Sequence, residues 1–123
     1  MKQYNLLIVD DEQRFVDMLA KRLRLRGCHC DVCYTGQQAL DLVRQKNFFL
    51  ILLELHLPDI YGIEVLTRIK VISAMTPVII LTGHGTEEDR RACMQQGAYA
   101  FRHKPLGIDE LMATLARIGE MSP

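Results

Sequence analysis

Short apolar runs alternate along the chain with amphipathic segments, and the two kinds of segment predict different secondary structure. A continuous apolar run predicts a strand buried on both faces, whereas apolar residues spaced three and four apart predict a helix with one buried face. The predicted strands are YNLLIV (4–9), CHCDVCY (28–34), FFLILLE (48–54), PVIILT (77–82) and YAFRH (99–103). A helical pattern follows each strand after a short connection, so the strand–helix unit occurs five times.

Each predicted helix carries an apolar stripe that marks its inward face. The stripes are Phe15, Leu19 and Leu23; Ala39, Leu40 and Val43; Val65, Leu66, Ile69 and Ile72; Cys93 with Ala92 or Met94; and Ile108, Leu111, Leu115 and Ile118. Thr35 with Gln38 and Thr86 with Asp89 have the spacing of capping boxes. The fourth helix has the thinnest stripe, so burial holds it least and we expect it to be the most mobile element.

The alternation of strand and helix predicts the fold class. It implies right-handed crossovers and a parallel sheet with helices on both faces. Five units are too few to close an eight-stranded barrel. We therefore predict an α/β fold with an open, doubly wound, five-stranded parallel sheet. Its 123 residues suit one domain, residues 1–123, with a core from about 4 to 119.

Composition narrows the class of protein. Hydrophobic residues make up 49% and charged residues 24%, as in ordinary soluble domains. The formal net charge is zero, so the basic excess typical of a nucleic-acid-binding domain is missing. No apolar run could span a bilayer and no signal peptide opens the chain, so we expect a cytoplasmic protein. We expect Cys28, Cys30, Cys33 and Cys93 to be reduced, mostly buried thiols, because no second C-x-x-C pair completes a zinc site.

Chemically active side chains stand at the ends of four predicted strands. Asp10 and Asp11 follow the first strand, Glu54 ends the third, Thr82 ends the fourth and Lys104 follows the fifth. Ligand sites of doubly wound sheets lie at these carboxyl ends. Clustered carboxylates repel unless a cation lies among them, and Mg²⁺ prefers such oxygen ligands. A hydroxyl and an ammonium group supply what a phosphoryl group needs. The pattern predicts phosphoryl transfer to a carboxylate, or an imitation of it.

Together, LLIVDDE (6–12), the LxLP turn (55–58), PVIILTG (77–83) and GAYAFRHKP (97–105) resemble a response-regulator receiver domain of bacterial two-component signalling. The resemblance covers residues 6 to about 118 and implies the CheY-like, flavodoxin-like strand order 2-1-3-4-5. A rival class, the aspartate-nucleophile phosphatases, requires D-x-D, which VDDE does not supply.

The resemblance also implies a magnesium site. Asp11 corresponds to a direct metal ligand and Asp10 to a ligand acting through water. Glu54 stands at the phospho-acceptor position and is expected among the ligands, together with the backbone carbonyl of His56.

Three further residues correspond to the family's switch. Thr82 is similar to the hydroxyl residue that moves toward the phosphoryl group, and Lys104 to the lysine that binds a phosphoryl oxygen. Phe101 stands at the aromatic position that turns inward on activation. The resemblance further implies a cis peptide bond between Lys104 and Pro105.

Glu54 departs from the family pattern, which has aspartate there, and Tyr61 is a second, milder departure. Glutamate reaches roughly 1–1.5 Å further than aspartate. A misplacement of ~1 Å can slow transfer on the order of 10²-fold, so we expect phosphorylation to be absent or very slow. A second hypothesis is that Glu54 reaches Lys104 and Thr82 and partly imitates the phosphorylated state. Because a carboxylate carries less charge than a phosphate, the inactive and the active-like state both stay open.

The resemblance implies a signalling switch that is not a turnover enzyme. Its expected partners are a sensor histidine kinase or phosphotransfer protein, and an output domain or partner protein on the face of the fourth helix, fifth strand and fifth helix. That face is also the expected one for a homodimer. The alternative is a pseudo-receiver, a protein-interaction module independent of phosphorylation. We expect either a stand-alone receiver or a domain of a longer protein.

Overall fold

The computed structural model describes residues 3–121, in which five strands and five helices alternate. The strands are β1 (Asn5–Val9), β2 (His29–Cys33), β3 (Leu50–Leu53), β4 (Val78–Thr82) and β5 (Ala100–His103). The helices are α1 (Gln13–Leu25), α2 (Gly36–Gln45), α3 (Gly62–Ile72), α4 (Glu87–Gln95) and α5 (Ile108–Met121). All strand pairs are parallel and the order is β2-β1-β3-β4-β5, which confirms the predicted fold class and strand order.

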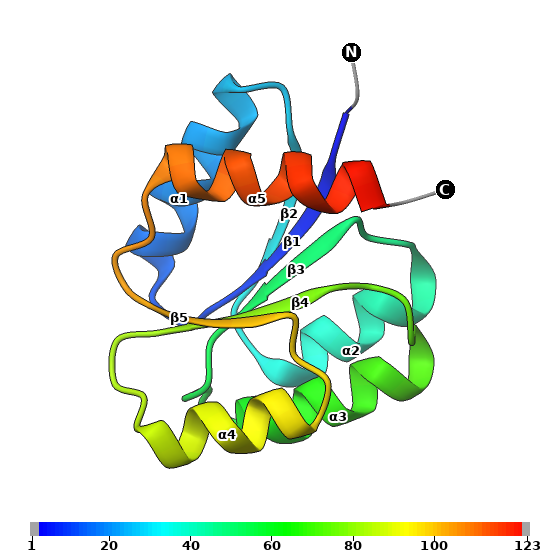
Figure 1. Ribbon diagram of the computed structural model, residues 1–123, viewed down its shortest axis with the longest axis vertical. Coiled ribbons are helices and arrows are strands. Elements are labelled where there is room, and N and C mark those ends of the chain that lie inside the picture. Colours follow the sequence, from blue (N-terminus) through cyan, green and yellow to red (C-terminus); the bar gives the residue numbers. More distant parts are fainter. Residues whose placement is uncertain (1–2, 122–123) are drawn as a thin grey trace.

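The sheet lies between two helical layers, with α1 and α5 on one face and α2, α3 and α4 on the other (Figure 1). Successive strand residues therefore enter different cores. In β1, Leu7 and Val9 belong to the core under α2 and α3, while Leu6 and Ile8 belong to the core under α1 and α5. This explains why the central strands are apolar at every position. No helix within residues 3–121 combines the length and apolar content needed to cross a membrane.

One predicted capping box is complete and the other is shifted by one residue. At α4, the Asp89 amide donates to Thr86 Oγ1 and the Thr86 amide to Asp89 Oδ2, both at 3.0 Å. At α2, the Gln38 amide donates to Thr35 Oγ1 at 3.1 Å. The Gln38 side chain, however, accepts from the Tyr34 amide at 2.9 Å, not from Thr35. The Gln38 side chain reaches past Thr35 to the Tyr34 amide. The second hydrogen bond of this predicted capping box, from the Thr35 amide to the Gln38 side chain, was therefore predicted wrongly.

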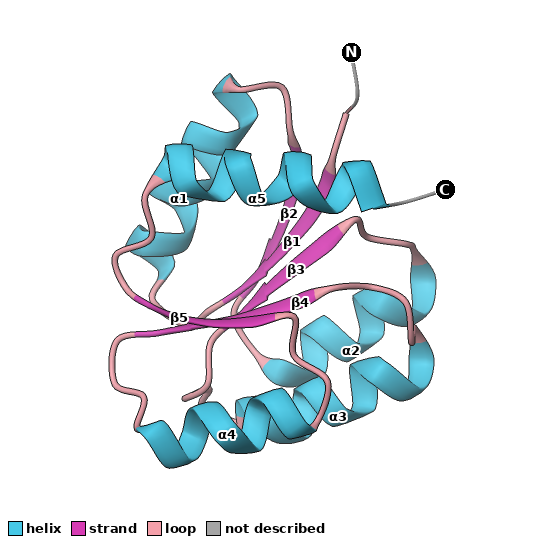
Figure 2. Cartoon of the chain, in the orientation of Figure 1, coloured by secondary structure: helices cyan, strands magenta, loops and turns pink. Residues whose placement is uncertain are grey.

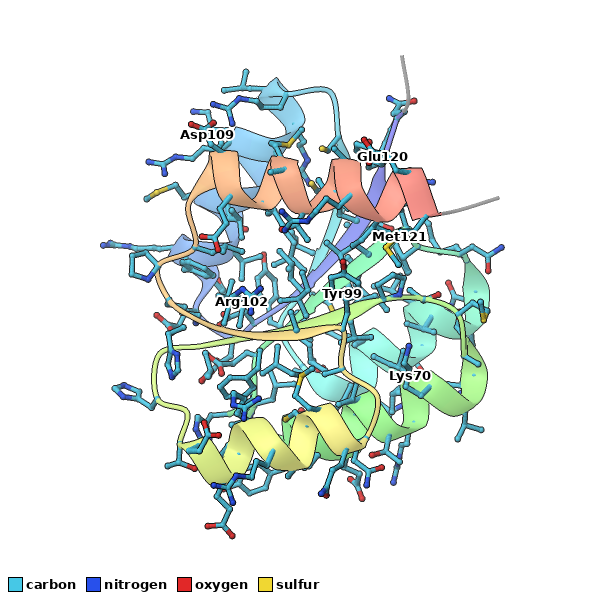
Figure 3. All side chains as sticks on the ribbon, viewed as in Figure 1. Lys70, Tyr99, Arg102, Asp109, Glu120 and Met121 are labelled. Atoms are coloured by element: carbon cyan, nitrogen blue, oxygen red, sulfur yellow. The ribbon has the colours of Figure 1, made fainter. Side chains whose placement is uncertain are left out.

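The inward stripe of α3 is one residue shorter than predicted. Ile69 is fully buried, but Ile72 is 37% exposed at the end of the helix, where the chain turns toward β4. Lys70 fixes this turn, because its ammonium group donates to the carbonyls of Ala74 (3.2 Å) and Thr76 (2.8 Å). Figure 3 shows Lys70 beside this connection. The prediction for Ile72 was wrong because the periodic pattern does not mark where the helix leaves the core.

The four cysteines are buried and unpaired with one another, which confirms the expectation of buried free thiols. Burial raises the pKa of Cys30 to about 11 and that of Cys33 to about 12. Since the thiolate is the reactive form, burial favours the less reactive thiol form of Cys30 and Cys33 at neutral pH.

Candidate functional site: an acidic pocket around one lysine

The loops that follow β1, β3, β4 and β5 leave the parallel sheet at the same edge, on the left in Figure 2. This edge brings together four of the predicted site residues: Asp10, Glu54, Thr82 and Lys104. Neighbouring strands fix this arrangement, since Glu54 donates its amide to the carbonyl of Val9 at 2.9 Å. The expected convergence of strand ends is therefore observed.

Lys104 lies at the centre of the pocket. Its Nζ is 2.6 Å from Asp10 Oδ2, 2.9 Å from Glu12 Oε1 and 2.9 Å from Glu54 Oε1. The same atom lies 4.5 Å from the centroid of the Phe15 ring, a cation–π contact. A lysine ammonium group has three N–H donors, and three carboxylates surround this one. The Lys104 side chain is only 12% exposed and those of Asp10 and Glu54 only 3% and 6%, so water screens these pairs little.

Glu54 uses both carboxylate oxygens. Oε1 accepts from Lys104, while Oε2 accepts from the backbone amides of Leu55 (2.6 Å) and His56 (3.1 Å). The hydroxyl of Thr82, a fully buried residue, also hydrogen-bonds to the carboxylate. One side chain thus connects the turn after β3 with the ends of β4 and β5. The extra methylene of glutamate lets the carboxylate fold back on its own turn while still reaching Lys104.

The pKa values of the pocket residues follow from burial and these contacts. Burial acts to raise the pKa of Glu54, but the hydrogen bonds from Lys104, Thr82 and the His56 amide together lower it. At Asp10, burial outweighs the Lys104 contact and raises the pKa. Burial acts to lower the pKa of Lys104, but its carboxylate neighbours raise it well above its ordinary value. The ammonium group is therefore charged throughout the physiological range.

Three acidic residues could hold a cation here: carboxylate oxygens of Asp10, Glu12 and Glu54 lie within 4.8 Å of one another. Such a donor set fits Mg²⁺ by ligand type, although the ammonium group already contacts all three. Glu12 was not among the predicted site residues, and its position directly before α1 was its only signal in the sequence. Asp11 is exposed and lies outside this group. Its role as a direct ligand, and that of the His56 carbonyl, stay predictions.

The Phe101 ring points into the protein, and the residue is only 6% exposed. Gly85 lies directly against it, because a Cβ on Gly85 would come within 2.5 Å of Phe101 Cζ and 2.8 Å of Thr82 Cγ2. The Lys104–Pro105 peptide bond is cis. Phe101 is therefore turned inward, and its role at the family's switch position stays a prediction.

The face formed by α4, β5 and α5 carries exposed side chains of mixed character. Figure 3 shows Tyr99 and Arg102 along β5, between α4 and α5. Tyr99 is 37% exposed, and Met94 on α4 is 38% exposed. Arg102 Nε lies 3.9 Å from Glu110 Oε1 on α5. The use of this face for partners or for dimerisation stays a prediction.

Comparison with known proteins agrees with the fold. The family model for the response regulator receiver domain matches residues 6–116. The chain therefore belongs to the response-regulator receiver family, whose members act as signalling domains in two-component systems.

Individual relatives and structures support this assignment. The chain is 34% identical over 119 residues to the response regulator ArlR of Staphylococcus haemolyticus, covering 97% of this chain and 54% of that protein. NtrX of Brucella abortus is 28% identical, with a TM-score of 0.87 over 98% of this chain and 28% of that one. A CheY-like receiver domain from Methanospirillum hungatei shares the fold, with a TM-score of 0.91 at 23% identity over 98% of this chain and 100% of that one. The chain spans about a quarter to a half of the length of its curated relatives.

Proposed function

We propose that this receiver domain is a two-component switch whose state is set in part by Glu54 itself, and that residue 54 takes up a phosphoryl group very slowly or not at all. One observation carries the proposal: the Glu54 carboxylate is 2.9 Å from Lys104 and hydrogen-bonded to Thr82. In the family these two positions are the ones that hold a phosphoryl group. The glutamate side chain thus makes contacts that an aspartyl phosphate would otherwise make.

The same contacts argue against ordinary phosphorylation. A carboxylate that attacks a phosphoryl donor needs one oxygen free and in line with the leaving group. Here Oε1 is bound to Lys104 and Oε2 to two backbone amides. The longer side chain also places its oxygens in the space that the incoming phosphoryl group would need. Both effects act in the same direction, toward slow transfer.

The imitation of the phosphorylated state is only partial. A carboxylate carries one negative charge, whereas a phosphoryl group carries nearly two and has three acceptor oxygens. A contact shifts a conformational equilibrium only by the free energy with which it favours one state over the other. The buried Phe101 ring supports a shift toward the active-like arrangement. The smaller charge of the Glu54 carboxylate therefore supports a receiver that is biased toward the active-like state but not locked in it.

Magnesium would bind at the carboxylates of Asp10, Glu12 and Glu54, where it would supply positive charge for phosphoryl oxygens. In this arrangement the ion competes with the Lys104 ammonium group for the same three carboxylates. We infer that metal binding is weaker here than in a receiver with aspartate at this position.

The proposed partners follow from the family. A histidine kinase or phosphotransfer protein would act on the pocket from the cytoplasm, and an output domain or partner protein would bind the face of α4, β5 and α5. The second candidate function is a pseudo-receiver, a binding module whose state does not depend on phosphate. The saturation of Lys104 by three carboxylates favours it, because no N–H donor is left for a phosphoryl oxygen.

A phosphorylation assay tests the proposal. The unmodified protein and the Glu54→Asp variant are incubated with acetyl phosphate and magnesium, and intact mass is followed over time. We expect Glu54→Asp to gain one phosphoryl group and the unmodified protein to react at least about 100-fold more slowly. Glu64→Asp is the matched control, because Glu64 is an exposed residue on α3. Rapid, stoichiometric phosphorylation of Glu54 would contradict the proposal.

Beryllium fluoride, an analogue of the phosphoryl group, separates the two candidate functions. Magnesium-dependent binding of this analogue by the unmodified protein favours a phosphorylation switch. If binding appears only in Glu54→Asp while the unmodified protein still binds its partner, the pseudo-receiver is favoured.

A further inference from the structure

The connection between β4 and α4, residues 83–86, is held from two sides by imidazole rings. His56, in the loop after β3, places Nε2 2.9 Å from the carbonyl oxygen of His84. His103, at the end of β5, places Nε2 3.2 Å from the carbonyl oxygen of Gly85. Two consecutive carbonyls of one loop are thus bound by two different elements of the fold.

The acceptors determine which nitrogen of each ring carries hydrogen. A carbonyl oxygen can only accept, so Nε2 of both His56 and His103 must be protonated. Each ring also packs edge-on against an aromatic neighbour. The centroids are 6.0 Å apart for His56 and Tyr61, and 5.7 Å apart for His103 and Phe101. A hydrogen bond and a ring contact together restrict each imidazole, although both residues are exposed.

The loop of residues 83–86 packs directly against the Phe101 ring. Gly85 approaches Phe101 and Thr82 so closely that a Cβ would come within 2.5 Å and 2.8 Å of them. The His84 amide also donates to Thr82 Oγ1 at 3.3 Å. With the loop in this place, the buried orientation of Phe101 and the position of Gly85 depend on each other. Any contact that holds residues 83–86 in this position therefore also favours the inward orientation of the Phe101 ring.

We propose that His56 and His103 are positioning residues that together fasten residues 83–86 over the buried Phe101 ring and hold this loop closed without a phosphoryl group. The two contacts act through backbone carbonyls and involve no atom of Glu54. Glu54 Oε2 does accept from the His56 backbone amide, but the two imidazole contacts are separate hydrogen bonds from those made by the Glu54 carboxylate. We therefore expect this clamp, the pair of His56 and His103 contacts, to persist in Glu54→Asp. It assigns a conformational role to two side chains that the pocket chemistry leaves unused.

The first test is the tautomer of each ring, read from the ¹⁵N chemical shifts of the imidazole nitrogens by NMR at pH 8. We expect both His56 and His103 to carry hydrogen on Nε2 in a single tautomer. His29, an exposed residue at the start of β2, serves as the internal reference and should average between tautomers. Averaged shifts for His56 and His103 like those of His29 would overturn the proposal.

The second test is amide hydrogen exchange at residues 83–86 in single and double variants. A lost hydrogen bond should speed exchange about fivefold, so His56→Leu and His103→Leu should each show this change and the double variant about 25-fold. Glutamine can place an amide N–H near Nε2, so His56→Gln and His103→Gln should retain most of the protection. His29→Leu should have no effect. Equal exchange in the leucine, glutamine and His29 variants would also overturn the proposal.

The tautomer measurement remains informative in two situations. The tautomer measurement uses the unmodified protein and still decides if a leucine variant fails to fold. Repeating it on Glu54→Asp separates this proposal from the proposed function, because unchanged His56 and His103 tautomers would support the clamp even if Glu54 proved to be an ordinary phospho-acceptor.

Discussion

Replacing Lys104 by methionine should destabilise the protein strongly, because it leaves three carboxylates without their shared cation. Methionine preserves most of the side-chain volume, so the change isolates the charge. The three contacts measure 2.6, 2.9 and 2.9 Å, and Asp10 and Glu54 are almost fully buried. Removing one partner of a buried ion pair costs about 3–5 kcal/mol, and we expect about 3 kcal/mol here because Lys104 retains slight exposure.

Urea unfolding at pH 7 in the presence of a chelator measures this loss. With an ordinary urea dependence of ~1.5 kcal/mol per molar, the midpoint should fall by about 2 M. Lys46→Met is the matched control. Its ammonium group is also 2.6 Å from a carboxylate, Asp31, but the two side chains are 51% and 37% exposed. An exposed pair contributes less than about 1 kcal/mol, so the control should change the midpoint little.

The pH dependence of the difference in unfolding free energy between the unmodified protein and Lys104→Met tests whether electrostatics causes that difference. The pKa of Glu54 is lowered in the folded state, so its contribution is present above its unfolded value of 4.5 and is lost as the pH falls. The raised pKa of Asp10 acts in the opposite direction and offsets part of this loss. In Lys104→Met the crowded carboxylates take up protons more readily, so acid relieves their repulsion. The difference between the two proteins should narrow to about 1 kcal/mol at pH 4. A loss equal to that of Lys46→Met, or one that does not change with pH, would refute the electrostatic argument.

Three further predictions concern the same end of the molecule. Gly85→Ala should cost about 1–3 kcal/mol or turn Phe101 outward, because the new methyl group would overlap the ring. The ¹H shifts of the Phe101 ring report this, and Gly83→Ala, where nothing lies within 4 Å of the added Cβ, should leave them unchanged. Thr86→Ala removes half of the capping box of α4 and should lower the free energy of unfolding by about 1 kcal/mol in the same urea assay, whereas Thr86→Ser should retain most of it. Magnesium should restore part of the stability lost in Lys104→Met, because a divalent ion can replace the ammonium group, and a midpoint unchanged by magnesium would argue against a cation site at these carboxylates.

The agreement between sequence and structure is best for the sheet and the pocket's main residues. Parallel strands in alternation with helices must end at a common edge, so the approach of Asp10, Glu54, Thr82 and Lys104 followed from their positions in the sequence. The apolar runs are continuous because both faces of the sheet are covered. The strand order came from the resemblance to receiver domains, since the alternation alone is compatible with more than one order.

The sequence-based predictions disagree with the structure for side chains in loops and near helix ends. Ile72 follows the helical pattern but stands at the end of α3, where the buried stripe stops. Gln38 passes over its predicted partner and accepts from Tyr34. Glu12, and not Asp11, turns toward Lys104 at the start of α1. In each case the spacing was correct, but the direction of the side chain depends on packing that the spacing does not contain.

By itself, the sequence determined that strands and helices alternate, that acidic groups gather with a hydroxyl and a lysine, and that a glutamate stands at the acceptor position. Local patterns suffice for these features, because burial dictates the period of each element and the parallel sheet dictates where strands end. Only the tertiary structure decided that Lys104 occupies the centre of the pocket and that imidazoles hold the loop over Phe101. These contacts join residues far apart in the sequence, since Lys104 and Glu12 are 92 positions apart, and their geometry is set by how separate elements pack.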